Sequence, residues 1–159
     1  MIFATVGTQL PFPRMIHALR HAVQHLDVEI IAQTIDTEYI YEPRGRLTCI
    51  KNLHPSEFQS LVTRAHIIVS HAGIGSIISA ASSCKPIALM PRQSDRAEHR
   101  NDHQIDTARR FEGRQGIYVF QDEAQLIDLL QTPLAPLAPI EPDKSPLING
   151  IKSFIWNGN

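Results

Sequence analysis

The sequence predicts an α/β fold, a Rossmann-like doubly wound parallel sheet, and three observations support this prediction. Short runs rich in β-branched residues alternate with segments of helical periodicity along residues 1–131. The strand-like runs are almost continuously apolar, as expected for strands covered on both faces of a parallel sheet. The chain has 159 residues, which suits a single domain with its own core.

Six runs are predicted to be strands, because each is short and apolar and is bounded by Gly, Pro or polar residues. They comprise residues 1–7, 28–34, 47–53, 66–70, 86–91 and 116–120. The second and third of these runs are separated by a polar, hairpin-like stretch that contains Pro43 and Gly45.

Five segments are predicted to be helices. They comprise residues 12–26, 55–65, 75–84, 100–113 and 123–131. Pro55 and Ser56 are typical of a first helical turn, and Gly113 is expected to end the fourth helix as a C-cap. The third helix is rich in small residues, and the others carry apolar side chains at helical spacing.

A Pro-rich extension and a short terminal apolar segment follow the domain, over residues 132–159. Residues 132–146 hold five of the 11 prolines and are predicted to form an extended surface segment outside the core. Residues 147–156 contain too many apolar side chains for a free tail. They either pack back on the domain or cover a partner.

Composition excludes several function classes. The formal net charge of −1 gives no basic excess for nucleic-acid binding. No apolar run approaches the ~20 residues that span a bilayer, and residues 1–6 lack the features of a signal peptide. Cys49 and Cys84 stand alone beside apolar residues and are expected to be reduced, buried thiols, which suggests a cytoplasmic protein.

Three polar loops follow predicted strands, over residues 6–12, 70–76 and 91–104. In an open parallel sheet, ligands bind outside the carboxyl ends of the strands. We therefore expect the three loops to meet at one cleft.

The loop "SHAGIGS" combines glycines with the start of a helix. Gly73 and Gly75 would let the backbone approach a ligand, and the helix N-terminus would favour a phosphate or diphosphate. The alternative is a plain turn that Ser70 caps. A nicotinamide fingerprint does not fit, because Ile78 stands where the third glycine is required, and no P-loop lysine follows.

The third loop is crowded with polar side chains, and three interpretations are open. Glu98, His99, Asp102 and His103 are possible metal ligands, but no metal-binding motif is present and no metal is expected. The segment could be a solvated helix start. The favoured interpretation is a sugar-recognising helix N-terminus, where several polar groups bind hydroxyls together.

Three stretches together resemble the C-terminal, donor-binding half of family 28 glycosyltransferases. They are "TVGTQ" with "PF", "SHAGIGSI", and "MPR" with "EHRNDHQ". The resemblance covers about residues 1–130 in the right order. It is strongest to the small subunits of two-component transferases, either Alg13-like or PssE-like.

The resemblance implies the C-terminal half of a GT-B fold and a UDP-sugar donor, with inversion at the anomeric carbon and no cofactor. It also implies an Alg14/PssD-like, membrane-anchored partner subunit that holds the chain at the inner membrane face. The isolated chain is a candidate to form a homodimer. The pathway implied is exopolysaccharide, capsule or lipid-linked glycan synthesis.

Site residues carried over from the resemblance fall into three groups. Those expected at the diphosphate are Gly7, Thr8, Gln9, His71, Gly73, Gly75 and Ser76. Those expected at the sugar are Glu98, Asp102, His103 and Gln104. Those expected at the nucleoside are Leu53, His54 and Ser79.

One departure from the family pattern concerns residues 77–83, which contain no acid where relatives place a ribose-binding glutamate. This opens an alternative function, a non-catalytic activating subunit. The general base is expected to come from the partner, so the chain alone should turn over little. An epimerase-like hydrolase would need two such domains, and this chain has one.

Overall fold

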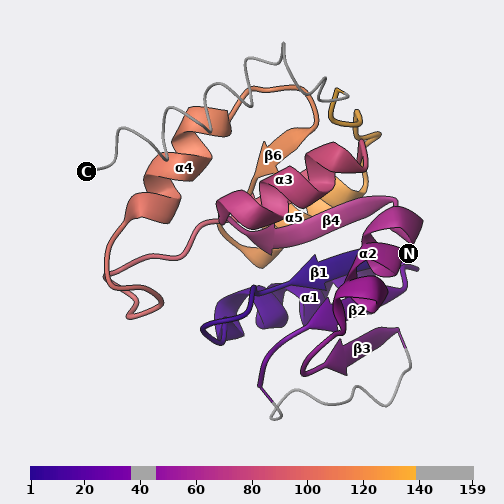
Figure 1. Cartoon of the computed structure of the whole chain (residues 1–159), viewed down its shortest axis with the longest axis horizontal. Coiled ribbons are helices and arrows are strands. Elements are labelled where there is room, and N and C mark those ends of the chain that lie inside the picture. The colour runs from indigo at the N-terminus through magenta and orange to yellow at the C-terminus, as the bar shows by residue number, and fades with distance from the viewer. Residues whose placement is uncertain (37–45, 139–159) are drawn as a thin grey trace.

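The computed structural model describes residues 1–36 and 46–138. The described residues form a six-stranded sheet in the order β3-β2-β1-β4-β5-β6, with every neighbouring pair parallel (Figure 1). The strands are β1 (Ile2–Thr5), β2 (Ile30–Gln33), β3 (Leu47–Ile50), β4 (Ile67–His71), β5 (Ile87–Met90) and β6 (Ile117–Val119). This order confirms the predicted doubly wound sheet and places its topological switch point between β1 and β4.

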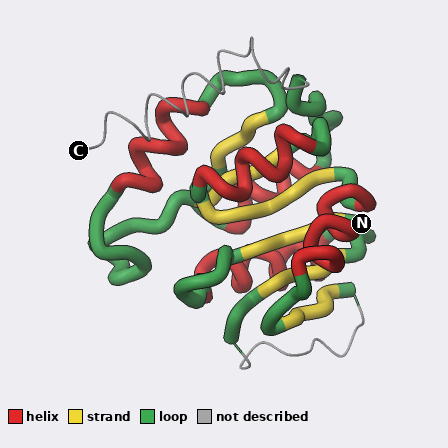
Figure 2. Tube along the Cα trace, viewed as in Figure 1, coloured by secondary structure: helices red, strands yellow, loops and turns green. Residues whose placement is uncertain are grey.

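Helices cover both faces of the sheet (Figure 2). They are α1 (Pro13–His25), α2 (Pro55–Arg64), α3 (Ile74–Ser82), α4 (His103–Phe111) and α5 (Glu123–Leu130). Buried residues of α1 and α5 belong to one apolar cluster, and those of α2, α3 and α4 belong to a second. The sheet therefore separates two cores, as its continuously apolar strands predicted.

The central strand β1 serves both cores by alternation. Ile2 and Ala4 lie in the cluster beneath α1 and α5, and Phe3 lies in the opposite cluster. All four residues of β1 are buried. Its register with β4 places Thr5, the last residue of β1, beside Ser70, so β4 extends one residue further, to His71.

Every predicted helix and strand is present, with differences at the boundaries. The fourth helix begins at His103 rather than near residue 100. The carboxylate of Asp102 accepts a hydrogen bond from the Ser94 backbone N–H at 2.8 Å, which keeps the preceding residues in a looped conformation. The predicted hairpin-like stretch at Pro43 and Gly45 and the terminal apolar segment at 147–156 lie outside the described residues.

Residues 132–138, here called the C-terminal strap, correct the expectation that the Pro-rich extension lies only on the surface. Leu137 is buried in the cluster beneath α2, α3 and α4, although the strap follows α5 on the other face. Its backbone lies so close to Gly116 that a Cβ there would overlap it, and Gly116 has a φ of +83°. The Tyr118 hydroxyl accepts a hydrogen bond from the Ala135 N–H at 2.8 Å.

We predict that Leu137→Ala lowers the free energy of unfolding by about 2 kcal/mol or more, because it opens a cavity in a packed cluster. The control is Ile78→Ala, since the Ile78 side chain on α3 is 40% exposed, and a change of at most about 0.5 kcal/mol is expected there. Urea denaturation measures both variants. Equal, small effects would show that the strap does not belong to the core.

Candidate functional site

A cavity of about 600 Å³ opens at the carboxyl edge of the sheet, over the switch point between β1 and β4. The three polar loops meet there, as the sequence predicted. Eleven of the expected site residues line it: Gly7, Thr8, Gln9, Leu53, His71, Gly73, Gly75, Ser76, Ser79, His103 and Gln104. His54, Glu98 and Asp102 do not belong to its lining.

His71 ends β4 and lies at the floor of the cavity between two glycines. A Cβ at Gly7 would lie 2.8 Å from the ring Cε1, and a Cβ at Gly73 would overlap the ring at Nε2. The imidazole therefore requires both glycines, whereas the sequence suggested that Gly73 allows a close approach to a ligand. Gly75 differs, because a Cβ there would meet no atom within 4 Å.

The environment of His71 keeps its ring neutral. Burial, and after it the nearby Arg92 guanidinium, lower its pKa to about 4. At neutral pH the cavity floor therefore carries an uncharged imidazole.

The N-terminus of α3 opens beside this ring. Its N-cap is Gly73, and no side chain caps the helix. Ser70 does not serve as a cap; it is fully buried in β4, and its hydroxyl donates to the Thr5 carbonyl at 3.1 Å. An uncapped N-terminus leaves backbone N–H groups and the positive end of the helix dipole for an anion.

The amide of Gly7 is less available than the sequence suggested. It donates to the Thr5 hydroxyl at 3.1 Å, and that hydroxyl donates in turn to the Gln33 side chain at 2.9 Å. Gly7 has a φ of +87°, a conformation that favours glycine. The loop after β1 therefore offers the cavity the groups of Thr8 and Gln9.

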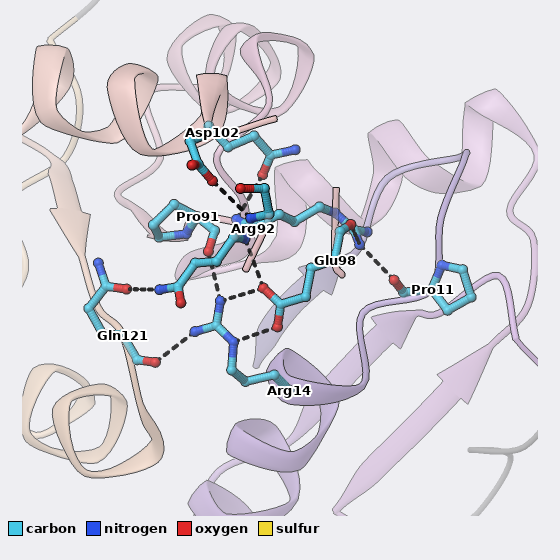
Figure 3. Close-up of polar contacts among 10 residues, drawn as sticks. Pro11, Arg14, Pro91, Arg92, Glu98, Asp102 and Gln121 are labelled. Atoms are coloured by element: carbon cyan, nitrogen blue, oxygen red, sulfur yellow. Dashed lines mark hydrogen bonds and ion pairs between the residues drawn. The ribbon is translucent and has the colours of Figure 1, made fainter. Parts of the chain in front are cut away.

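Arg92 is a site residue that sequence reasoning missed. It follows β5 directly, is 2% exposed, and lines the cavity. Its guanidinium lies over the Phe12 ring at 4.4 Å from the centroid and donates to four backbone carbonyls, of which that of Pro11 is drawn in Figure 3. These belong to Val6 (3.0 Å), Leu10 (2.6 Å), Pro11 (2.6 Å) and Glu98 (3.3 Å).

Burial lowers the pKa of Arg92 to about 10, and the Glu98 carboxylate opposes the shift, so the guanidinium stays charged at neutral pH. The only sequence signal for this role is the position of Arg92, which leaves a buried strand at the same edge as His71. Its hydrogen bonds to carbonyls of a distant loop could not be read from the sequence.

Glu98 was expected at the sugar, and the structure gives its carboxylate another role. Oε1 and Oε2 accept hydrogen bonds from Arg14 at 2.7 and 2.8 Å, and Oε2 also accepts from the Gln93 N–H at 3.0 Å (Figure 3). The side chains of Arg14 and Glu98 are only 16% and 10% exposed. Glu98 thus joins the third loop to α1, and its expected place at the sugar is not supported.

Asp102 does not line the cavity either, whereas His103 and Gln104, which follow it, do. The Ser94 backbone N–H holds the pKa of Asp102 below its usual value. The pKa of His103 is lowered by burial and by neighbouring His99, whose ring centroid lies 4.4 Å away. Gln104 is 4% exposed, and its side-chain carbonyl accepts from the Arg92 N–H at 3.2 Å.

The side of the cavity expected to hold the nucleoside is mainly apolar. Leu53 and Phe58 line it, while His54 is the N-cap of α2 and closes a capping box with Glu57. Phe58 packs edge-on against Phe3 at 5.2 Å and was missed from the sequence. Ser79 donates its hydroxyl to the Gly75 carbonyl at 2.9 Å.

Within residues 1–36 and 46–138, no three His, Cys, Asp or Glu side chains are grouped so that they could hold a metal ion. The clustered residues of the third loop are bound to other protein groups instead. Asp102 accepts from Ser94, and the Nδ1 atom of His103 is hydrogen-bonded to the Asn101 side chain.

The family model for the glycosyltransferase family 28 C-terminal domain matches residues 1–146. None of the curated proteins compared with the chain matches it.

Solved structures share the fold. The solution structure of ALG13 has a TM-score of 0.60 at 17% identity, over 87% of this chain and 89% of that one. MurG of Acinetobacter baumannii gives 0.59 at 17% identity, over 80% of this chain and 39% of its own. A UDP-glucose:anthocyanidin 3-O-glucosyltransferase in complex with UDP gives 0.62 at 16% identity, over 95% and 34%. The chain thus spans most of ALG13 but only one third to two fifths of the two larger enzymes.

We predict that Glu98→Gln lowers the free energy of unfolding by about 3 kcal/mol, because it leaves Arg14 without a counter-charge in a poorly solvated position. Asp106→Asn is the matched control, since Asp106 pairs with Arg109 at 3.9 Å with both side chains exposed, and should change stability by less than about 0.5 kcal/mol. Chemical denaturation compares them. An unchanged stability in Glu98→Gln would return Glu98 to the list of candidate ligands.

Proposed function

The chain belongs to the glycosyltransferase family 28 C-terminal domain family, and from that premise we propose that it is the donor-binding subunit of an inverting, UDP-sugar-dependent glycosyltransferase. It would act with a membrane-associated, acceptor-binding partner of Alg14 or PssD type. The proposed setting is the synthesis of exopolysaccharide, capsule or lipid-linked glycan.

One observation carries the proposal: a cavity at the switch point of a GT-B half-fold is lined by an uncapped helix N-terminus and by glycine-rich loops. Such a site suits a diphosphate, because backbone N–H groups and the helix dipole both favour negative charge. The α3 end and His71 would hold the diphosphate, and His103 and Gln104 would face the sugar. The apolar wall at Leu53 and Phe58 would face the nucleoside base.

In transfer, an acceptor hydroxyl attacks the anomeric carbon, and the bond from that carbon to the diphosphate oxygen breaks. The negative charge that grows on the leaving diphosphate would be stabilised by the α3 N-terminus and by hydrogen bonds from the cavity. A general base must take the proton of the acceptor hydroxyl. We assign that base to the partner, because the described part of this chain supplies only the donor face of the cleft.

The proposed partner subunit also determines where we expect the chain to be located. Along residues 1–36 and 46–138, no helix combines the length and apolar character that a membrane crossing requires. We propose a cytoplasmic subunit that is held at the inner membrane face through its partner.

A second candidate function is a non-catalytic activating subunit that binds no donor. Two observations favour it: residues 77–83 contain no acid, and the Ser79 hydroxyl is engaged by the Gly75 carbonyl. A ribose would then have a weaker grip on α3 than in relatives with a glutamate there.

Calorimetric titration of the purified chain with UDP-glucose and UDP-N-acetylglucosamine separates the two functions. The donor-binding function predicts saturable binding by the chain alone and sugar transfer only after the partner is added. If the chain alone binds neither UDP-sugar, but its addition to the partner restores sugar transfer, the activating-subunit function would be favoured. Strong transfer by the chain alone would contradict both.

We predict that Gly75→Ala weakens UDP-sugar binding at least about tenfold without loss of stability. A Cβ at Gly75 would project into open space at the mouth of α3, where the diphosphate is proposed to lie, and Ala in a helix is favoured over Gly by up to about 1 kcal/mol. Calorimetry and thermal unfolding of the same sample measure the two effects. Unchanged affinity would move the diphosphate away from this end of α3.

A further inference from the structure

Ser70 lies behind the cavity, where it contacts the one imidazole on the cavity floor. It is fully buried and forms the last pair of the β1–β4 ladder with Thr5. Its Oγ lies 3.1 Å from the Thr5 carbonyl oxygen and 3.2 Å from Nδ1 of His71. Nothing in the proposed donor site itself requires a hydroxyl at this buried position.

The three atoms fix where the protons lie. A carbonyl oxygen only accepts, so the single hydroxyl proton of Ser70 must point to Thr5. If it pointed to His71 instead, two bare oxygens would face each other at 3.1 Å. The Ser70 oxygen therefore accepts from Nδ1 of His71, which must carry the ring proton.

A second contact gives the same answer. The Thr5 backbone also hydrogen-bonds to His71, and this contact favours the protonated ring, as a carbonyl acceptor does. The Ser70 oxygen at Nδ1 and the Thr5 backbone thus both favour a protonated ring nitrogen. A neutral imidazole carries one N–H proton, so Nε2 of His71 then carries no proton.

The other nitrogen, Nε2, faces the backbone of Gly73 at the start of α3. It has no hydrogen-bond partner within the described ranges 1–36 and 46–138. Neutral His71 therefore presents a lone pair, not an N–H donor, at the place where the diphosphate is proposed to bind.

We propose that Ser70 is a positioning residue that holds His71 in its Nδ1–H form, so that a diphosphate binds only as Nε2 takes up a proton. This inference rests on the proposed donor-binding function. It adds that donor binding is coupled to the uptake of one proton by His71, and that the buried Ser70 sets this coupling.

Other charged groups around the ring set the conditions for this uptake. Arg92 follows β5, while His99 and His103 come from the third loop and the start of α4, and each acts on His71 with the same sign of charge. In the empty cavity they oppose a second proton on the ring. A bound diphosphate offsets them and raises the pKa of His71, because an adjacent negative charge favours the cation.

The direction of the pH effect follows from this change. The pKa of His71 is about 4 in the empty protein and higher in the complex, so one proton is taken up on binding between the two values. Affinity for a UDP-sugar should then fall as pH rises above the lower value, by up to about tenfold per pH unit. The diphosphate of a UDP-sugar keeps a constant charge over this range and does not add its own titration.

The first experiment tests the tautomer without any ligand. Imidazole ¹⁵N NMR of the full chain at pH 7 should show a protonated Nδ1 and a bare Nε2 for His71. Ser70→Ala should increase the population with the proton on Nε2, and Ser70→Thr, which keeps the hydroxyl, should restore the original pattern. A wild-type His71 that carries its proton on Nε2 would overturn the inference, whether or not the variants fold.

The second experiment tests the linkage with UDP-glucose. Titrations at pH 6 in buffers of different ionisation enthalpy should show net proton uptake by the wild-type chain. His71→Gln should lose about one proton of that uptake, whereas His25→Gln, at the end of α1 and outside the cavity lining, should keep it. Equal uptake in the wild type and in His71→Gln would overturn the linkage. An absence of UDP-glucose binding at every pH would instead count against the proposed function, and the tautomer measurement would still decide the role of Ser70.

Discussion

The site depends on one buried cation. The Arg92 guanidinium donates to carbonyls of the loop after β1 and of the third loop, and it stacks on Phe12 at the entry to α1. A guanidinium with little access to water must satisfy its N–H groups, and the chain does this with backbone oxygens. The two loops that border the cavity are consequently held to one another, and the ion pair between Arg14 and Glu98 adds a second tie between the same regions.

This arrangement separates the residues that build the cavity from those that face its interior. Charged groups of the third loop are used internally: Glu98 on Arg14, and Asp102 on Ser94. The groups left for a ligand include backbone amides, the side chains of Gln9 and Gln104, and imidazoles. Such a site attracts an anion through dipoles and through one buried cation, Arg92, so its preference depends on geometry and on protonation.

The sequence was sufficient for the fold, because strand and helix periods are local and the order of elements limits a parallel sheet to few topologies. It also brought the three polar loops to one edge correctly. It failed at Leu137, which packs in the opposite core, and it did not anticipate that Glu98 binds Arg14 on α1, a partner far away in the chain. Asp102 binds Ser94, eight positions away, and lies outside the cavity lining. Arg92 was missed because its acceptors Val6, Leu10 and Pro11 are more than 80 positions away. Contacts of this kind are set by tertiary packing, which leaves no periodic trace in the sequence.

The C-terminal strap has a consequence for aggregation. β6 is an edge strand of only three residues, and an open edge can pair with a strand of another molecule. The strap leaves α5 on one face, contacts Gly116 and Tyr118 beside this edge, and anchors Leu137 on the opposite face. The strap therefore packs beside the outermost strand, and its own residues are already packed against the two cores. A shortened form of the domain intended for crystallisation or fusion should retain residues up to 138, so that this guard against strand exchange is kept.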